Sequence, residues 1–129
     1  VLNMKIQQSA ENYLETILML QKKMGSVRSI DIVNELNFSK PSISVAMKHL
    51  KEKEYIEMDS KGIITLTLKG RNVAEQIYER HQLIAKILIQ LGVNPDTAYE
   101  DSCKIEHDLS QESYDKIKDY YNTHLLNHP

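Results

Sequence analysis

The stretch from Asn37 to Lys51 reads NFSKPSISVAMKHLK and predicts a short helix with two unlike faces. Ser39 can cap this helix, and Pro41 fits its first turn, where the amide that proline lacks would have no partner in any case. Three apolar side chains recur at helical spacing and predict the buried face: Ile43, Met47 and Leu50. The opposite face carries hydroxyl and lysine side chains, namely Ser39, Ser42, Ser44, Lys48 and Lys51.

This polar face has the chemistry of a helix that enters a DNA groove. Short hydroxyl side chains near a helix N-terminus let the backbone approach a phosphate or a base edge, and lysines further along neutralise phosphate charge. An ordinary surface helix is the alternative for this segment taken alone. The neighbouring segments decide between the two interpretations.

Two further helices are predicted upstream. The first starts from a cap at Ser9 and runs to about Met24, and the second starts from a cap at Ser29 and covers residues 30–36. The apolar stripe of the first helix is formed by Tyr13, Ile17, Leu20 and Met24. Residues 37–39 then join two short helices so tightly that we expect a helix-turn-helix, whose second helix lies in the major groove.

Downstream of Lys53 the apolar pattern alternates with a period of two. Segments 55–58 and 63–68 flank the sequence DSKG at 59–62 and predict a β-hairpin, in which three side chains face the core: Ile64, Leu66 and Leu68. A helix-turn-helix followed directly by a hairpin is a winged helix. Lys61 then lies at the wing tip, near a phosphate.

The rest of the chain predicts a helical lobe. Thr67 caps a long helix over 69–91, whose apolar side is formed by Val73, Ile77, Ile84, Ile87, Leu88 and Leu91. A second helix begins at Asn94-Pro95-Asp96 and runs to about Asp108, and Ser110 caps a last one with a stripe of Tyr114, Ile117, Tyr121 and Leu125. These helices bury little area by themselves, so we expect the lobe to complete its core by dimerising.

Composition limits the class of protein. With 129 residues and 41% hydrophobic content, the chain suffices for one compact unit or two small lobes. No apolar run approaches the ~20 residues that span a bilayer, and no leader-like sequence opens the chain, so we expect a cytoplasmic protein without membrane association. The formal charge is −2, so DNA binding must depend on local placement: residues 26–69 hold seven basic and six acidic side chains, and residues 92–129 hold three and eight.

A second chemical signal lies at 103–107, CKIEH. On a helix, Cys103, Glu106 and His107 fall at i, i+3 and i+4, so a thiolate, a carboxylate and an imidazole share one face, which suits a first-row divalent metal. The alternative is a buried cysteine beside a solvated Glu-His pair. His81 lies on the apolar stripe of the long helix, where a core histidine is the usual finding.

Together these segments resemble the diphtheria toxin repressor family of metal-dependent repressors, including its manganese transport regulator branch. The resemblance runs from residues 9–15, SAENYLE, through 66–70, LTLKG, to 105–110, IEHDLS. It implies a homodimer whose winged helices bind palindromic operator DNA when Fe²⁺ or Mn²⁺ is bound. Many members add an SH3-like domain, and we expect this chain to be a short form without it.

The same resemblance implies a ligand set that mixes two branches of the family. Glu106 and His107 match ligands common to the family, and Cys103 matches the cysteine of the iron-responsive branch. Glu15 and His81 match ligands of the manganese branch. Asn12 stands where the iron branch has methionine and the manganese branch has aspartate, while Ala85 and Tyr99 stand where the iron branch has ancillary ligands.

The predicted ligands indicate only a preference among divalent metals. The Cys103 thiolate is softer than a carboxylate and disfavours Mn²⁺, whereas Glu15 and Glu106 supply hard oxygen. The sequence favours Fe²⁺ slightly over Mn²⁺, with Zn²⁺ and Co²⁺ as alternatives.

The predicted fold is mainly α with a small β-wing. A winged helix-turn-helix DNA-binding domain over 1–70 is followed by a helical metal-binding and dimerisation domain over 71–129. The predicted function is that of a metal-activated transcriptional repressor controlling iron or manganese uptake genes. The residues predicted to contact DNA are Arg28, Ser39, Lys40, Pro41, Ser42, Ser44, Lys48, Lys51 and Lys61.

Two other functions remain open at this stage. One is a winged-helix DNA-binding regulator whose metal site is structural or degenerate. The other is a small metal-dependent hydrolase with Glu106 as general base, although the chain offers no second cluster for substrate, so we expect no enzyme.

Overall fold

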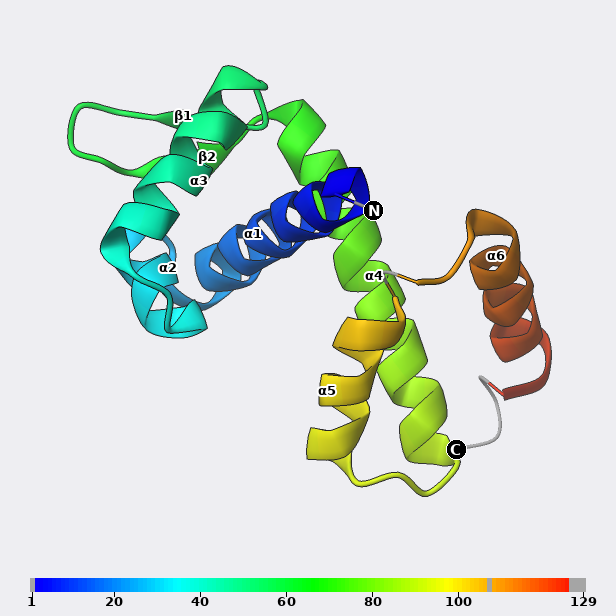
Figure 1. Ribbon diagram of the computed structural model, residues 1–129. Coiled ribbons are helices and arrows are strands. Elements are labelled where there is room, and N and C mark those ends of the chain that lie inside the picture. The colour runs from blue at the N-terminus through cyan, green and yellow to red at the C-terminus, as the bar shows by residue number, and fades with distance from the viewer. Residues whose placement is uncertain (1, 107, 126–129) are drawn as a thin grey trace. The chain divides into compact units, whose positions relative to one another are not determined.

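The computed structural model describes residues 2–106 and 108–125, with side chains from residue 10 onward (Figure 1). The chain divides into two compact units, Val1–Gln76 and Ile77–Pro129, and the boundary falls within helix α4. The predicted architecture, mainly α with a small β-wing, is confirmed. Within the described ranges no helix is both long enough and apolar enough to cross a membrane.

The first unit is a winged helix-turn-helix. Its elements are α1 (Leu2–Met24), α2 (Ser29–Leu36), α3 (Lys40–Glu52), β1 (Ile56–Met58), β2 (Ile64–Leu66) and the first turns of α4 (Leu68–Gln90). Helix α2 packs against both α1 and α3, β1 packs against α3, and β2 packs against α1. The core gathers apolar side chains from each of these elements, chiefly Leu14, Ile17, Leu18, Val27, Ile32, Ile43, Met47, Ile56 and Ile64.

Helix α3 has the cap and the buried face that its sequence predicts. The Ser42 amide donates to the Ser39 hydroxyl oxygen at 3.2 Å, and proline occupies the first turn. Ile43, Met47 and Leu50 are at most 3% exposed. Every predicted DNA-contacting side chain of this helix therefore lies on its exposed side.

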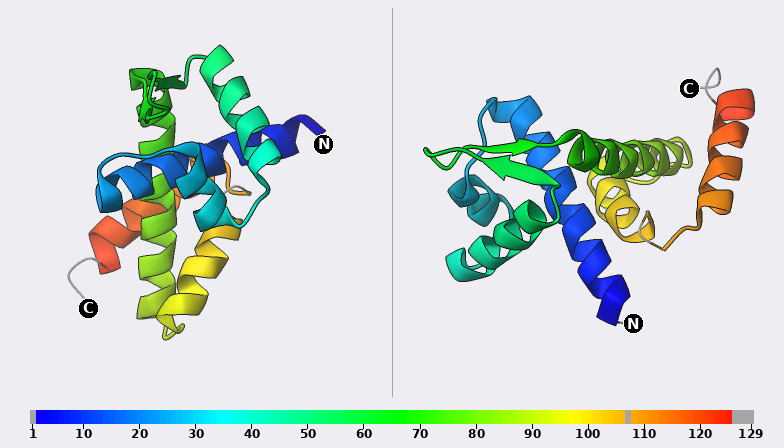
Figure 2. Two further views of the ribbon diagram at one scale, coloured as in Figure 1. Left: turned by 90° about the vertical axis from the view of Figure 1, so that its left-hand side faces the viewer. Right: turned by 90° about the horizontal axis from the view of Figure 1, so that it is seen from above.

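The wing is a short antiparallel hairpin. Ile56 pairs with Leu66 and Met58 with Ile64, and the Ile64 amide also donates to the Val27 carbonyl at 2.7 Å. Figure 2 shows the two strands side by side with their turn projecting beyond them. In that turn the Asp59 carboxylate accepts from the amides of Lys61 at 2.8 Å and Ile63 at 2.9 Å.

A close backbone contact joins the hairpin to the start of α4. Thr67 caps the helix, because its hydroxyl accepts from the Gly70 amide at 3.1 Å, and its own amide donates to the Tyr55 carbonyl at 3.1 Å. A Cβ atom added at Gly70 would lie 2.0 Å from the Tyr55 carbonyl oxygen. Only glycine permits this approach.

The second unit consists of the later turns of α4, α5 (Pro95–Ile105), α6 (Gln111–Tyr120) and a π-helical turn at Tyr121–Leu125. Helix α5 lies alongside α4 in each view (Figures 1 and 2). Helix α6 is held to α4 by an ion pair between Lys118 and Glu79, and this ammonium lowers the pKa of the Glu79 carboxyl. The Gln90 amide group donates to the Leu125 carbonyl at 3.3 Å.

The first helix differs from its prediction. It begins at Leu2, before Ser9, because residues 2–8 contain no glycine or proline that would end a helix. Its buried face is formed by Leu14, Ile17, Leu18 and Leu20. Met24 was wrongly assigned to that face and is 52% exposed, since the chain turns away at Gly25, whose φ is +89°.

Several other expected boundaries were wrong by a few residues. Arg28, and not Ser29, caps α2: its amide donates to the Asp31 carboxylate at 2.9 Å, and its φ of −125° is extended. Leu68 does not face the core as a strand residue. It is the first residue of α4 and is 76% exposed, as is Leu91, which follows the end of that helix. Helix α5 ends at Ile105.

The Gly70 contact gives a stability prediction. Gly70→Ala is expected to lower the free energy of unfolding by about 1–3 kcal/mol, because the new Cβ must displace the Tyr55 main chain. Urea unfolding followed by circular dichroism measures the change. The matched control is Asn72→Ala, an exposed position of the same helix, which should stay within about 0.5 kcal/mol of the unsubstituted protein. Equal unfolding midpoints for the two variants would contradict the prediction.

Candidate metal centre

Side chains of the second unit that could bind a metal lie near His81. This residue lies on the buried side of α4 and is 6% exposed. Its Nε2 atom is 3.1 Å from the Tyr99 carbonyl oxygen and 3.3 Å from the Cys103 sulfur, both of α5. A proton on Nε2 that is donated to the Tyr99 carbonyl leaves the lone pair of Nδ1 for a metal, which is the common arrangement behind ligating histidines.

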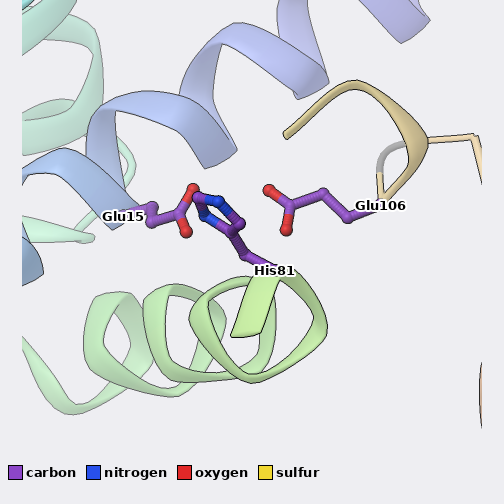
Figure 3. Close-up of side chains that lie close together, drawn as sticks. All are labelled: Glu15, His81 and Glu106. Atoms are coloured by element: carbon purple, nitrogen blue, oxygen red, sulfur yellow. The ribbon is translucent and has the colours of Figure 1, made fainter. Parts of the chain in front are cut away.

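Glu106 completes this group. It directly follows α5, it is 1% exposed, and one of its carboxylate oxygens lies within 4.8 Å of a His81 ring nitrogen (Figure 3). Buried carboxylates are costly unless they are paired or coordinate a metal. Imidazole nitrogen and carboxylate oxygen are donors that suit a first-row divalent cation. The Cys103 side chain is exposed, and its sulfur is near the His81 ring.

Glu15 is the predicted ligand of the first unit. It is carried by α1 and is 5% exposed, so it lies on the buried side of this helix (Figure 3). Asn12, one turn earlier, is exposed. His107, the remaining predicted ligand, lies outside the described residues.

The positions of the ancillary site carry no ligands here. Ala85 is fully buried, and the Tyr99 ring meets the His81 ring edge-on, with centroids 5.7 Å apart. Tyr99 therefore contributes an aromatic wall and a backbone carbonyl to the His81 site. The sequence did not predict this role, because a carbonyl oxygen carries no sequence signal.

Arg80 holds the main chain beside Glu106. Its Nη1 donates to the carbonyls of Glu106 at 3.2 Å and Leu109 at 3.1 Å, and its Nη2 donates to the Gln111 side chain at 2.8 Å. The guanidinium also lies 4.8 Å from the centre of the Tyr114 ring. Burial, and after it the Glu79 carboxylate, raises the pKa of Tyr114 to about 12, so this ring stays neutral at physiological pH. Sequence reasoning assigned Arg80 no role of its own.

The predicted DNA-contacting residues all lie in the first unit, and all are exposed. Those of α3 are distributed over its exposed surface, outside the buried face, Lys61 lies in the wing turn, and Arg28 precedes α2. The Ser39 hydroxyl donates to the Ser42 hydroxyl at 2.8 Å. The structure thus groups the α3 residues, while Arg28 and Lys61 flank them along the chain.

Two family models cover nearly all of the chain. Residues 5–63 match the iron dependent repressor N-terminal DNA-binding domain, and residues 67–127 match the iron dependent repressor metal-binding and dimerisation domain. A curated relative is consistent with these family models. The HTH-type transcriptional regulator MntR of Listeria monocytogenes serotype 4a is 35% identical over 121 residues, which are 94% of this chain and 84% of that protein. The chain belongs to the iron-dependent repressor family.

Other relatives and solved structures support this assignment. The transcriptional regulator MntR of Escherichia coli O157:H7 is 32% identical over 88% of this chain and 74% of its own length. The structure of the manganese regulator SloR is 25% identical with a TM-score of 0.76, over 88% of this chain and 53% of that one. The crystal structure of T. acidophilum IdeR shows the same fold, with a TM-score of 0.78. It is 24% identical, and the match covers 87% of this chain and 53% of that one. The chain thus spans about half the length of these solved proteins.

Family membership confirms the resemblance seen in the sequence. Members are transcriptional repressors with a DNA-binding domain followed by a metal-binding and dimerisation domain, and the metal-dependent regulator predicted from the sequence is of this kind. The geometry around His81 therefore lies in the part of the chain that the family uses to bind metal.

Arg80 gives a prediction for this centre. Arg80→Lys is expected to raise the dissociation constant for Mn²⁺ about tenfold. The guanidinium holds the main chain at Glu106 and Leu109 by donating to three acceptors, and an ammonium group cannot reach all three. Electron paramagnetic resonance of unbound Mn²⁺ measures the affinity. Arg71→Lys is the matched control on the same helix, where the guanidinium is exposed and pairs with Glu75 at 3.6 Å. If both variants bind Mn²⁺ like the unsubstituted protein, Arg80 does not support the centre.

Proposed function

We propose that this chain acts in the cytoplasm as a homodimeric, metal-activated repressor of iron- or manganese-uptake genes. The observation that supports the proposal most is that the buried His81 and Glu106 lie within ligand distance of each other in the unit that matches the metal-binding family model. The Cys103 sulfur lies 3.3 Å from His81 Nε2. The exposed side of α3 supports the DNA-binding part of the proposed function. No catalytic step belongs to this proposal.

The proposed DNA surface combines α3 with flanking basic residues. Hydroxyl and proline side chains at the N-terminal end of α3 would meet base edges, as in other helix-turn-helix proteins. Lysines further along α3 and in the wing would meet phosphates, together with Arg28. The full proposed set is Arg28, Ser39, Lys40, Pro41, Ser42, Ser44, Lys48, Lys51 and Lys61.

The proposed ligands come from both domains, for which we keep the boundaries 1–70 and 71–129. His81, Cys103 and Glu106 would bind the cation from the second domain, with His107 predicted from its family position. Glu15 would bind it from the first domain, which its burial and its match to the manganese branch support. Asn12 has the weakest support, because it is exposed.

The choice between Fe²⁺ and Mn²⁺ depends on which side chains bind. A site that uses the Cys103 thiolate is softer and favours Fe²⁺, Co²⁺ or Zn²⁺ over Mn²⁺. A site of Glu15, His81 and Glu106 without the thiol is harder and suits Mn²⁺. Solved relatives include a manganese-dependent repressor in complex with manganese and ScaR with bound Zn²⁺, so related folds accept more than one cation.

An apolar groove in the second unit supports dimerisation. Its lining comes from α4, α5, α6 and the segments that follow α5 and α6, and includes Ile84, Ile87, Leu88, Leu91, Ile105, Leu109, Ile117, Tyr120 and Leu125. Exposed apolar surface of this kind is a usual dimer contact. A dimer would present two copies of α3 to the two halves of a palindromic operator.

Ligands from two domains would couple cation binding to DNA binding. If Glu15 and His81 bound the same ion, the motion of the two domains would be restricted. The two recognition helices of the dimer would then sample fewer separations. DNA binding would tighten when the remaining separations match the spacing of the two half-sites. By linkage, operator DNA must then tighten cation binding by the same factor.

The direct test is a DNA titration with Mn²⁺, with Fe²⁺ under anaerobic conditions, and with chelator, using duplexes from the upstream region of the protein's own gene. We expect the metal to tighten binding on the order of tenfold to a hundredfold. Glu106→Gln should remain folded and dimeric but lose this difference. Glu100→Gln, an exposed position of α5, should retain it. Equal affinity with metal and with chelator would refute metal activation.

A second test addresses the DNA surface. Lys48→Ala should weaken binding to all sequences similarly and reduce the slope of log affinity against log salt by about one, because one phosphate contact is lost. Ser42→Ala should instead change the preferred sequence. Lys104→Ala removes the same charge from an exposed position of α5 and should leave the slope unchanged. An unchanged slope for Lys48→Ala would place the DNA elsewhere.

A further inference from the structure

One exposed residue of α3 does not fit its polar surroundings. Val45 is 56% exposed, although β-branched apolar residues are among those most often buried. It lies in the second turn, within the N-terminal half of the helix that base-reading residues usually occupy. We infer that Val45 reads the 5-methyl group of a thymine in the major groove, an inference that rests on the proposed DNA-binding function of α3.

The geometry of the helix places Val45 at the centre of the proposed DNA surface. A helix turns by about 100° per residue, so the side opposite Ile43 and Met47 is centred near Val45. Pro41 and Lys48, four residues before and three residues after it, share that side. A groove that receives these two residues therefore meets Val45 between them.

The chemistry of valine limits what it can recognise there. Its side chain has no donor or acceptor, so it cannot bind a phosphate or hydrogen-bond to a base edge. Thymine is the base that presents a methyl group in the major groove, and apolar side chains recognise that methyl by contact. Pro41, one turn earlier, adds a second apolar surface beside it, so the pair would favour thymine without a hydrogen bond.

Charge favours DNA over a protein partner for this surface. Lys48 lies on the same side of α3 as Val45, Lys40 and Lys51 lie on the adjoining flank of the helix, and all three are exposed. The acidic residue of the helix, Glu52, lies on the side of Val45 but two turns later, in the last turn, where its carboxylate is 3.9 Å from the His49 ring. A polyanion with methyl groups in its groove matches a basic surface with an apolar centre.

The experiment removes the methyl group and nothing else. Duplexes that bind the full chain with Mn²⁺ or Fe²⁺ are selected from a random pool. Each thymine of one half-site is then replaced by deoxyuridine, which keeps the base pair and the phosphates. Fluorescence anisotropy gives the dissociation constant of each duplex for the unsubstituted protein and for Val45→Ala.

One thymine should stand out for the unsubstituted protein. Loss of its methyl is expected to weaken binding about fourfold, the effect of exposing one methyl group, and this effect should vanish in Val45→Ala. Leu68→Ala removes a 76% exposed leucine from the same unit and should keep the fourfold effect. Val45→Gln should select adenine at that position, because glutamine can bond to adenine N6 and N7.

Two outcomes would overturn the inference, and they differ. Methyl effects that are the same in the unsubstituted protein and in Val45→Ala would show that α3 binds DNA without using Val45. Failure of the metal-loaded protein to enrich any duplex would instead refute the proposed function itself. Circular dichroism of Val45→Ala excludes unfolding as the cause of a lost effect.

Discussion

Burial of one face of α3 is the constraint on which the DNA-binding unit depends. Ile43, Met47 and Leu50 are covered by neighbouring elements, and truncating such a side chain typically costs about 2–5 kcal/mol. This energy fixes the rotation of the helix about its axis. A rotation by one residue would bury Ser44 and expose an isoleucine, so packing against the core also determines which side chains remain available to a ligand.

The second unit uses one helix for two tasks at adjacent positions. His81 of α4 points to α5, where it meets Tyr99 and Cys103, while Arg80 reaches the main chain at Glu106 and Leu109. Successive helical residues diverge by about 100°, so a donor and its supporting group can act on different segments. The centre is thus organised by hydrogen bonds to backbone carbonyls as much as by the side chains that could bind metal.

Sequence reasoning succeeded where the signals are local. The cap at Ser39, the buried face of α3 and the wing turn follow from the spacing of a few residues, and the structure has them. The contact of His81 with Cys103 joins residues far apart in the chain, so periodicity could not predict it, and the resemblance to a family could. Leu68 and Leu91 were misjudged because apolar residues at helix ends are covered only if another element reaches them. Val45 was not among the residues predicted for the polar face of α3, and its exposure became known only from the structure.

The turn of the wing has a consequence for the thermodynamics of association. Asp59 accepts two amides of its own loop, and Gly62 takes a φ of +81° that other residues rarely adopt. The loop is therefore ordered by internal hydrogen bonds before any ligand arrives, and little conformational entropy remains to be lost on contact. The Lys61 side chain would still lose rotamer freedom in a contact, but its backbone, already ordered, would lose little conformational entropy. Association through the wing should then be governed mainly by the release of counterions and water, and its heat should depend only weakly on loop ordering.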